Sequence, residues 1–134
     1  MIRPARAEDV LGMVALSEQM RLQYQDYQPQ FWHKAGDSAT TQALFFESQL
    51  QQENVLMSVW EQEGRLLGFV AGMLVPAPPV YDPGGLTFLI DDFVVEAEAD
   101  WITVGRELLA GLESEARARG ASQVVVMCGD RDTI

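Results

Sequence analysis

Two adjacent aspartates, Asp91 and Asp92, lie inside an otherwise apolar run at residues 86–95. A carboxylate with apolar neighbours can have a pKa suited to a general base, so the pair is a candidate for proton abstraction. Successive residues of a strand point to opposite faces, so one of the two should face a cleft unless a bulge intervenes. The alternative is that the strand is already solvated here and that the pair has no catalytic role.

The turn after these aspartates, at residues 96–105, leads from a predicted strand into a predicted helix. The free amide N–H groups at a helix start and the positive end of the helix dipole point at the same place, which makes an anion site. Any β-α turn offers part of this arrangement, so the turn alone does not specify a ligand. The sequence shows no spacing typical of metal ligands, no Ser-His-Asp order and no phosphate loop, so no metal site is expected.

The elements that position these residues follow from hydrophobic periodicity and turn residues. A short strand is predicted at residues 2–5, a helix from residue 7 to about 24, and a second helix from residue 37 or 38 to about 52. A hairpin with a turn at Glu63-Gly64 follows at residues 55–75, then a proline-rich loop at 76–85 and a long strand at 86–95. A last helix carries one apolar stripe, formed by Val104, Leu108, Leu109, Leu112 and Ala116.

Residues 123–128 complete the pattern as a nearly all-apolar strand, which is typical of a strand covered on both faces. The order is therefore β-α-α-β-β-β-α-β. It predicts an α/β (α+β) fold with a mixed, mostly antiparallel sheet flanked by helices. We expect a single domain over residues 1–134, because no repeat or linker divides the chain.

The chain carries 20 acidic and 9 basic residues, a net charge of −11. A surface this negative repels phosphate backbones, so nucleic acid is not an expected partner, whereas a cationic amine would be attracted. Solubility alone is the simpler explanation of the acidity. The single cysteine, Cys128, allows no intrachain disulfide and suits the cytoplasm, and no apolar run is long enough to predict a membrane span.

The segments at residues 90–96 and 104–109 resemble parts of the GNAT family of N-acetyltransferases. The run Ile90-Asp91-Asp92-Phe93-Val94-Val95-Glu96 is similar to the family's fourth strand, and Val104-Gly105-Arg106-Glu107-Leu108-Leu109 is similar to its third helix. The other elements follow the family's order over essentially the whole chain. The resemblance implies a GNAT-like fold, acetyl-coenzyme A (acetyl-CoA) as co-substrate, and direct attack by a primary amine of a small molecule or peptide on the acetyl group.

The resemblance also implies roles for individual residues. Asp91 or Asp92 would be the base. The acceptor site would be bordered by Tyr24, Tyr27, Phe31 and Tyr81, and the cofactor would be held by Val94, Val95, Thr103, Val104, Gly105 and Arg106. The pyrophosphate motif departs from the family pattern where Asp100 replaces Arg or Gln and Thr103 replaces Gly. A negative charge and a β-branched side chain at these positions oppose a diphosphate.

The chain ends at Ile134, before the tyrosine-bearing helix and the two closing strands that are usual in the family. We therefore expect the C-terminal strands to be missing, and an unprotected sheet edge that favours a homodimer or a truncated chain. Two alternatives to an enzyme stay open. One is a non-catalytic binding or assembly module of the same fold, and the other is an acyl-CoA sensor that binds without turnover.

Overall fold

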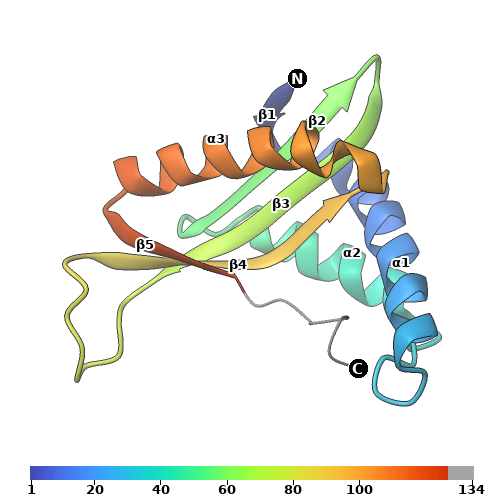
Figure 1. Cartoon of the computed structure of the whole chain (residues 1–134), viewed down its shortest axis with the longest axis horizontal. Coiled ribbons are helices and arrows are strands. Elements are labelled where there is room, and N and C mark those ends of the chain that lie inside the picture. The colour runs from blue at the N-terminus through green and yellow to red at the C-terminus, as the bar shows by residue number, and fades with distance from the viewer. Residues whose placement is uncertain (127–134) are drawn as a thin grey trace.

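The structure is a computed structural model that describes residues 1–126 (Figure 1). Within this range the elements follow the order predicted from the sequence, with two short 3-10 helices, η1 and η2, added. The fold class expected from the sequence is thereby confirmed. The elements are β1 (Ile2–Pro4), η1 (Ala7–Asp9), α1 (Val10–Tyr27), α2 (Ser38–Gln49), β2 (Val55–Gln62), β3 (Arg65–Val75), β4 (Leu86–Val95), η2 (Glu98–Ile102), α3 (Val104–Ala118) and β5 (Ala121–Val126).

The described strands form one sheet in sequence order, β1-β2-β3-β4-β5. Neighbours pair antiparallel from β1 to β4, and β5 pairs parallel with β4 because α3 makes the crossover between them. The turn between β2 and β3 places Glu63 and Gly64 at φ values of 53° and 80°, the positive values that a type I′ hairpin turn requires. The turn predicted at these two residues is confirmed.

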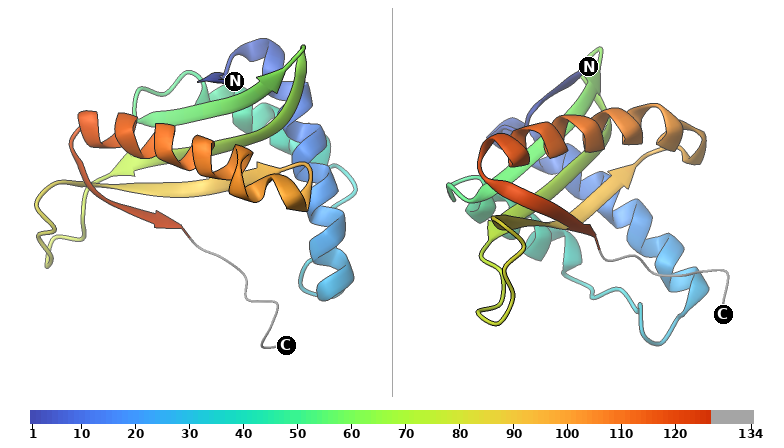
Figure 2. Two further views of the ribbon diagram at one scale, coloured as in Figure 1. Left: turned by 45° about the horizontal axis from the view of Figure 1, so that its top comes forward. Right: turned by 60° about the vertical axis from the view of Figure 1, so that its left-hand side comes forward.

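Helices cover both faces of the sheet (Figures 1 and 2). On one face α1 and α2 enclose a core that includes Met13 and Phe46, and on the other face α3 encloses a core that includes Leu108. The end of β4 contributes to both cores, because Val94 lies in the first and Val95 in the second. This alternation fixes the orientation of the strand that carries the two aspartates.

The helices end at different residues from those predicted. α1 extends to Tyr27 rather than to about residue 24. Proline disfavours helical backbone at the residue before it, and Gln28, next to Pro29, has left the helical conformation with φ −146° and ψ 85°. α2 ends at Gln49 rather than at about residue 52, and Asp37, one of the two predicted cap residues, lies at its N-cap position.

Side chains at the two helix starts are used for contacts between elements. Neither Asp37 nor Ser38 caps α2 with its side chain, and the Ser38 hydroxyl instead donates to Glu18 of α1 at 2.6 Å. At the start of α1, the buried Asp9 carboxylate accepts two hydrogen bonds from the Arg3 guanidinium, at 2.7 and 2.8 Å. These bonds tie β1 to α1.

Two predictions of burial are wrong. Val125 and Val126 of β5 are 38% and 48% exposed, because β5 lies at the edge of the described sheet and its apolar side chains are not covered on both faces. Leu109 is 37% exposed, since the buried stripe of α3 repeats every four residues and Leu109 falls one position beside it. The other members of that stripe are buried, as predicted.

No helix in the described part of the chain has the length and apolar character needed to cross a membrane. Cys128 and the predictions made for the chain end lie outside the described residues.

Candidate functional site

The site is organised around an irregularity in the pairing of β3 with β4. Ala71 opposes Asp92 while the next residue, Gly72, opposes Ile90, so Asp91 is an extra residue in β4 and forms a β-bulge. Gly72 permits the close approach of the strands here. A Cβ atom on it would lie 2.4 Å from the Leu89 carbonyl oxygen. The bulge that the sequence left open is therefore present, and it interrupts the alternation of side chains at the aspartates.

The bulge gives the two aspartates different surroundings. Asp92 shares a face with Val94, so it lies on the side of the sheet that α1 and α2 cover, and it is partly buried. Asp91 is exposed. Partial removal from solvent raises the pKa of both carboxyl groups above their usual range, including that of the surface residue Asp91. For Asp92 the positive charge of Arg21 lowers the pKa again in part, and the negative charge of Asp91 raises it further.

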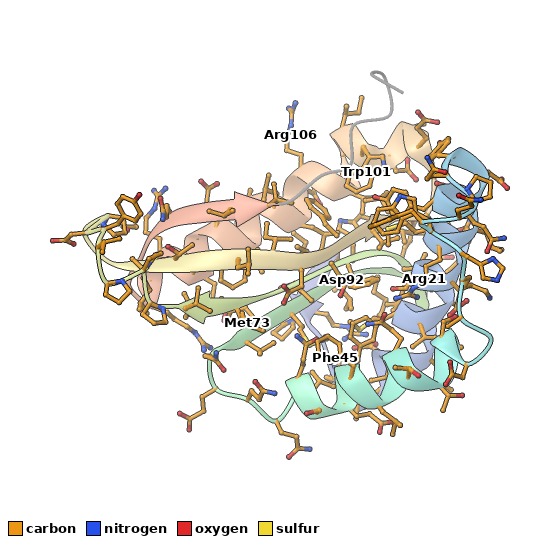
Figure 3. The ribbon with its side chains drawn as sticks, turned by 90° about the horizontal axis from the view of Figure 1, so that it is seen from below. Arg21, Phe45, Met73, Asp92, Trp101 and Arg106 are labelled. Carbon is orange, nitrogen blue, oxygen red and sulfur yellow. The ribbon has the colours of Figure 1, made fainter. Side chains whose placement is uncertain are left out.

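Arg21, which the sequence reasoning did not single out as a site residue, lies on α1 on the same side of the sheet as Asp92 (Figure 3). Its Nη2 donates to the side-chain oxygen of Gln42 on α2, and its Nη1 lies 3.7 Å from the Glu18 carboxylate. A signal for Arg21 exists in the sequence, where Val10, Met13, Val14, Ser17 and Arg21 follow helical spacing. A charged residue continuing an apolar stripe faces the protein rather than the solvent.

The start of α3 supplies backbone donors. Val104, Gly105 and Arg106 form the first turn of α3, where N–H groups have no acceptor within the helix itself. Arg106 is exposed and extends away from the sheet (Figure 3). Thr103 precedes the helix, and its hydroxyl donates to the Asp100 carbonyl oxygen at 3.2 Å. A positive dipole end, free amides and one guanidinium can together hold an anion.

An aromatic side chain occupies part of this region. The Trp101 ring packs against Gly105, where a Cβ atom would come within 2.7 Å of the Trp101 Cε3 atom. The same ring makes an edge contact with Phe93 of β4, with ring centroids 4.9 Å apart. Gly105 therefore has a packing role in addition to the role implied by the resemblance.

The carboxyl-terminal half of β4 offers a second row of backbone groups. β5 pairs with β4 from Leu86 to Ile90, where it reaches Val126, the last described residue (Figures 1 and 2). The Glu96 N–H donates to Leu67 of β3, so alternation directs the amide of Val94 toward β3 as well. The backbone groups of Phe93 and Val95 point instead to the side away from β3, where no strand in residues 1–126 pairs with them. Phe93 was not among the predicted cofactor residues, because only the pairing register distinguishes it from Val94.

The predicted acceptor residues do not all lie together. Tyr24 stacks on Trp32 with ring centroids 5.2 Å apart, and Phe31 meets the edge of the same ring at 4.7 Å. Tyr27 is exposed at the end of α1. Tyr81 is 72% exposed in the β3–β4 loop, which lies at the opposite end of the sheet from the loop after α1 (Figure 1). Three of the four predicted residues thus cluster around the end of α1, and Tyr81 does not join them.

Residues 1–126 contain no group of three or more His, Cys, Asp or Glu side chains that could hold a metal ion.

Comparison with known proteins decides the family. A profile described as "Acetyltransferase (GNAT) family" matches residues 8–133, nearly the whole chain. The protein belongs to the GNAT acetyltransferase family. No curated protein matches the sequence significantly. The family that the sequence motifs resembled is therefore confirmed.

Solved structures of GNAT proteins share the fold at low sequence identity. A mutant of the BH1408 protein of Bacillus halodurans has a TM-score of 0.82 and 19% identity, over 97% of this chain and 83% of that one. A predicted acetyltransferase of Clostridium acetobutylicum, solved with acetyl-CoA, has a TM-score of 0.76 and 16% identity, over 97% and 81%. Glucosamine-6-phosphate N-acetyltransferase of Arabidopsis thaliana has a TM-score of 0.68 and 18% identity, over 96% and 82%. At this identity the likeness shows the fold alone.

Proposed function

We propose that the protein transfers the acetyl group of acetyl-CoA to a primary amine by direct attack, with Asp92 as the general base. One observation carries this assignment. The bulge at Asp91 turns Asp92 toward the side of the sheet that α1 and α2 cover. The same strand continues past Asp92 to Phe93 and Val95, whose backbone groups point away from β3, and then leads to the first turn of α3. A base and an anion site are thus joined through one rigid element, as acyl transfer requires.

The residues present suit acetyl-CoA. Its diphosphate would be held by the N–H groups of Val104, Gly105 and Arg106, by the helix dipole and by the Arg106 guanidinium. Its amide-bearing arm would lie along the part of β4 beyond its described pairing with β5, where Phe93 and Val95 present backbone groups. The structure of the Clostridium acetobutylicum relative, solved with acetyl-CoA, supports the choice of this cofactor.

Acetyl-CoA, when bound, supplies a thioester carbonyl carbon that an amine can attack. The Asp92 carboxylate takes the proton that the ammonium group must lose before its nitrogen lone pair can form the new C–N bond. The C–S bond then breaks, and the leaving thiolate takes its proton from solvent. Burial raises the pKa of Asp92, which brings this carboxylate closer to the basicity that proton removal from an ammonium needs.

The acceptor would enter on the side of the sheet where Asp92 and Arg21 lie with Phe45 and Met73 (Figure 3). Phe45 is 46% exposed although it is a large apolar side chain, so it can contact an acceptor without rearrangement. The residues Tyr24, Tyr27 and Phe31 lie around the end of α1 and would contact the more distant part of a longer acceptor. An amine attached to an apolar or aromatic group suits this surface.

The test is turnover of acetyl-CoA with a panel of primary amines, measured as release of free CoA by chromatography. We expect Asp92→Asn to lower kcat/KM by about a hundredfold to ten-thousandfold, the usual contribution of a general base. The matched control is Asp91→Asn, which removes the adjacent exposed carboxylate and should lower kcat/KM less than tenfold. Equal activity of wild type and Asp92→Asn would overturn the assignment of the base.

A second candidate is a non-catalytic module or acyl-CoA sensor of the same fold. The packing of Trp101 on Gly105 favours it, because an aromatic ring then occupies space beside the backbone that would meet a diphosphate. Calorimetric titration with acetyl-CoA separates these possibilities. Binding with no turnover of any amine would indicate a sensor, and a folded protein that does not bind would indicate a module for another partner.

A further inference from the structure

Arg21 is held on the side of the sheet to which the partly buried Asp92 points, without a hydrogen bond to it (Figure 3). Its side chain is 25% exposed and is anchored from two helices, by Gln42 of α2 and by Glu18 of its own helix. Its Nη1 atom is buried and makes no hydrogen bond within the described residues. Long polar side chains lose conformational entropy when they are fixed in this way.

The positive charge of Arg21 is only partly neutralised by its neighbours. Glu18 is the nearest carboxylate, but it accepts hydrogen bonds from Lys34 at 2.7 Å and from Ser38 at 2.6 Å. One carboxylate is thus shared by two cations, and the group of Glu18, Arg21 and Lys34 has one positive charge in excess. This excess lies on the side of the sheet to which Asp92 points (Figure 3).

The charged groups that act on Asp92 can be named for each element packed around it. From α1 the acting charge is Arg21, and from β4 it is Asp91. β3 presents Ala71 opposite Asp92, and α2 presents the neutral amide of Gln42 beside Arg21. Burial and Asp91 both favour the protonated carboxyl group, and Arg21 is the one group described here that favours the carboxylate.

We propose that Arg21 is a positioning residue, whose fixed charge keeps Asp92 ionised and able to accept the proton of the incoming ammonium group. The catalytic part of this proposal rests on the proposed function, but the ionisation of Asp92 does not. The same charge disfavours an ammonium ion in the site relative to a neutral amine, so it assists proton loss from the acceptor as well.

The decisive experiment titrates Asp92 in the ligand-free protein by following its side-chain carboxyl 13C resonance in NMR spectra. Wild type is compared with Arg21→Gln, Arg21→Met and Arg21→Lys. We expect both neutral variants to move the Asp92 midpoint upward, because they remove the positive charge that favours the carboxylate. Arg21→Lys keeps a charge and should restore most of the wild-type midpoint.

The matched control is Arg117→Gln, which removes one arginine from the exposed surface of α3, on the other face of the sheet. It should leave the Asp92 midpoint unchanged. An unchanged midpoint in a folded Arg21→Gln or Arg21→Met protein would overturn the proposal. The second neutral variant is included because Met has no buried polar atoms to satisfy, so it keeps the test valid if the Gln variant does not fold.

Kinetics with an amine that is turned over complete the test. The acid limb of the kcat/KM profile should move upward in Arg21→Gln by the same amount as the Asp92 midpoint and return in Arg21→Lys. An upward shift of the NMR midpoint with no turnover in wild type would support the ionising role of Arg21 and reject the proposed function. A kinetic profile that does not move while the midpoint does would overturn the link between Arg21 and catalysis.

Discussion

The contact between Trp101 and Gly105 predicts that an alanine at position 105 has an effect that depends on residue 101. A Cβ atom there would lie 2.7 Å from the Trp101 Cε3 atom, whereas carbon atoms in contact sit about 3.5–4.0 Å apart. The ring must therefore move by about 1 Å, which also disturbs its edge contact with Phe93. Overpacking of this kind costs about 1–3 kcal/mol, and replacing a helical glycine by alanine returns up to about 1 kcal/mol.

The assay is a double-mutant cycle in urea. We expect Gly105→Ala to lower the free energy of unfolding by about 0–2 kcal/mol in wild type, and to raise it by up to about 1 kcal/mol when Trp101→Ala has removed the ring. The coupling between the two positions should therefore be about 1–3 kcal/mol. Trp101 is only 40% exposed, so the ring has to lose contacts as it moves.

A second glycine of the same helix provides the control. At Gly111 a Cβ atom would approach Ile2 no closer than 3.6 Å, which is an ordinary contact. Gly111→Ala should stabilise the protein by up to about 1 kcal/mol in both backgrounds. Equal effects of Gly105→Ala with and without Trp101, within about 0.5 kcal/mol, would refute the packing described here.

Three further outcomes are expected. Gly72→Ala should lower stability by about 3 kcal/mol in urea unfolding, because its Cβ would meet the Leu89 carbonyl oxygen at 2.4 Å; a loss below about 1 kcal/mol would contradict the bulge geometry. Asp9→Asn should lower the free energy of unfolding by about 2 kcal/mol at neutral pH. Hydrogen bonds from Arg3 lower the pKa of Asp9, so its stabilising effect is present above the usual aspartate range and is lost as pH falls through the lowered value. Unfolding curves of wild type and variant should thus converge in acid, and a constant difference would argue against this linkage. Arg106→Gln should weaken acetyl-CoA binding roughly tenfold in calorimetry, while Arg117→Gln on the same helix should not.

Elements with strong local signals could be predicted from the sequence. The bounds of β2, β3 and β4 agree with the predicted ones, because the hairpin turn at Glu63-Gly64 and the proline-rich loop mark where these strands stop. The strand β5 shows the limit of this reasoning. An apolar run predicts a strand, but whether one or both faces are covered depends on neighbours that are distant in the sequence.

The candidate site could be predicted only in part, for a similar reason. The sequence pointed to two aspartates and could not choose between them, since the choice depends on a bulge that Gly72 on another strand permits. Arg21 is the last of a set of residues that follow helical spacing in the first helix. Its position relative to Asp92, however, depends on how α1 packs across the sheet. Phe93 differs from Val94 only by which side of β4 its backbone groups face.

Gly105 illustrates why a matching motif residue does not by itself establish a ligand contact. In this protein the space beside its Cα atom is filled by Trp101, so packing favours glycine there whether or not a phosphate approaches. The backbone amides and Arg106 remain available, and Asp100 nearby contributes a negative charge. Binding of a diphosphate then depends more on the charge of Arg106 and on the dipole of α3 than on a close approach of the phosphate to the backbone at Gly105. Because exposed charges are screened by salt over about 10 Å at 0.1 M, the affinity for acetyl-CoA should fall as ionic strength rises.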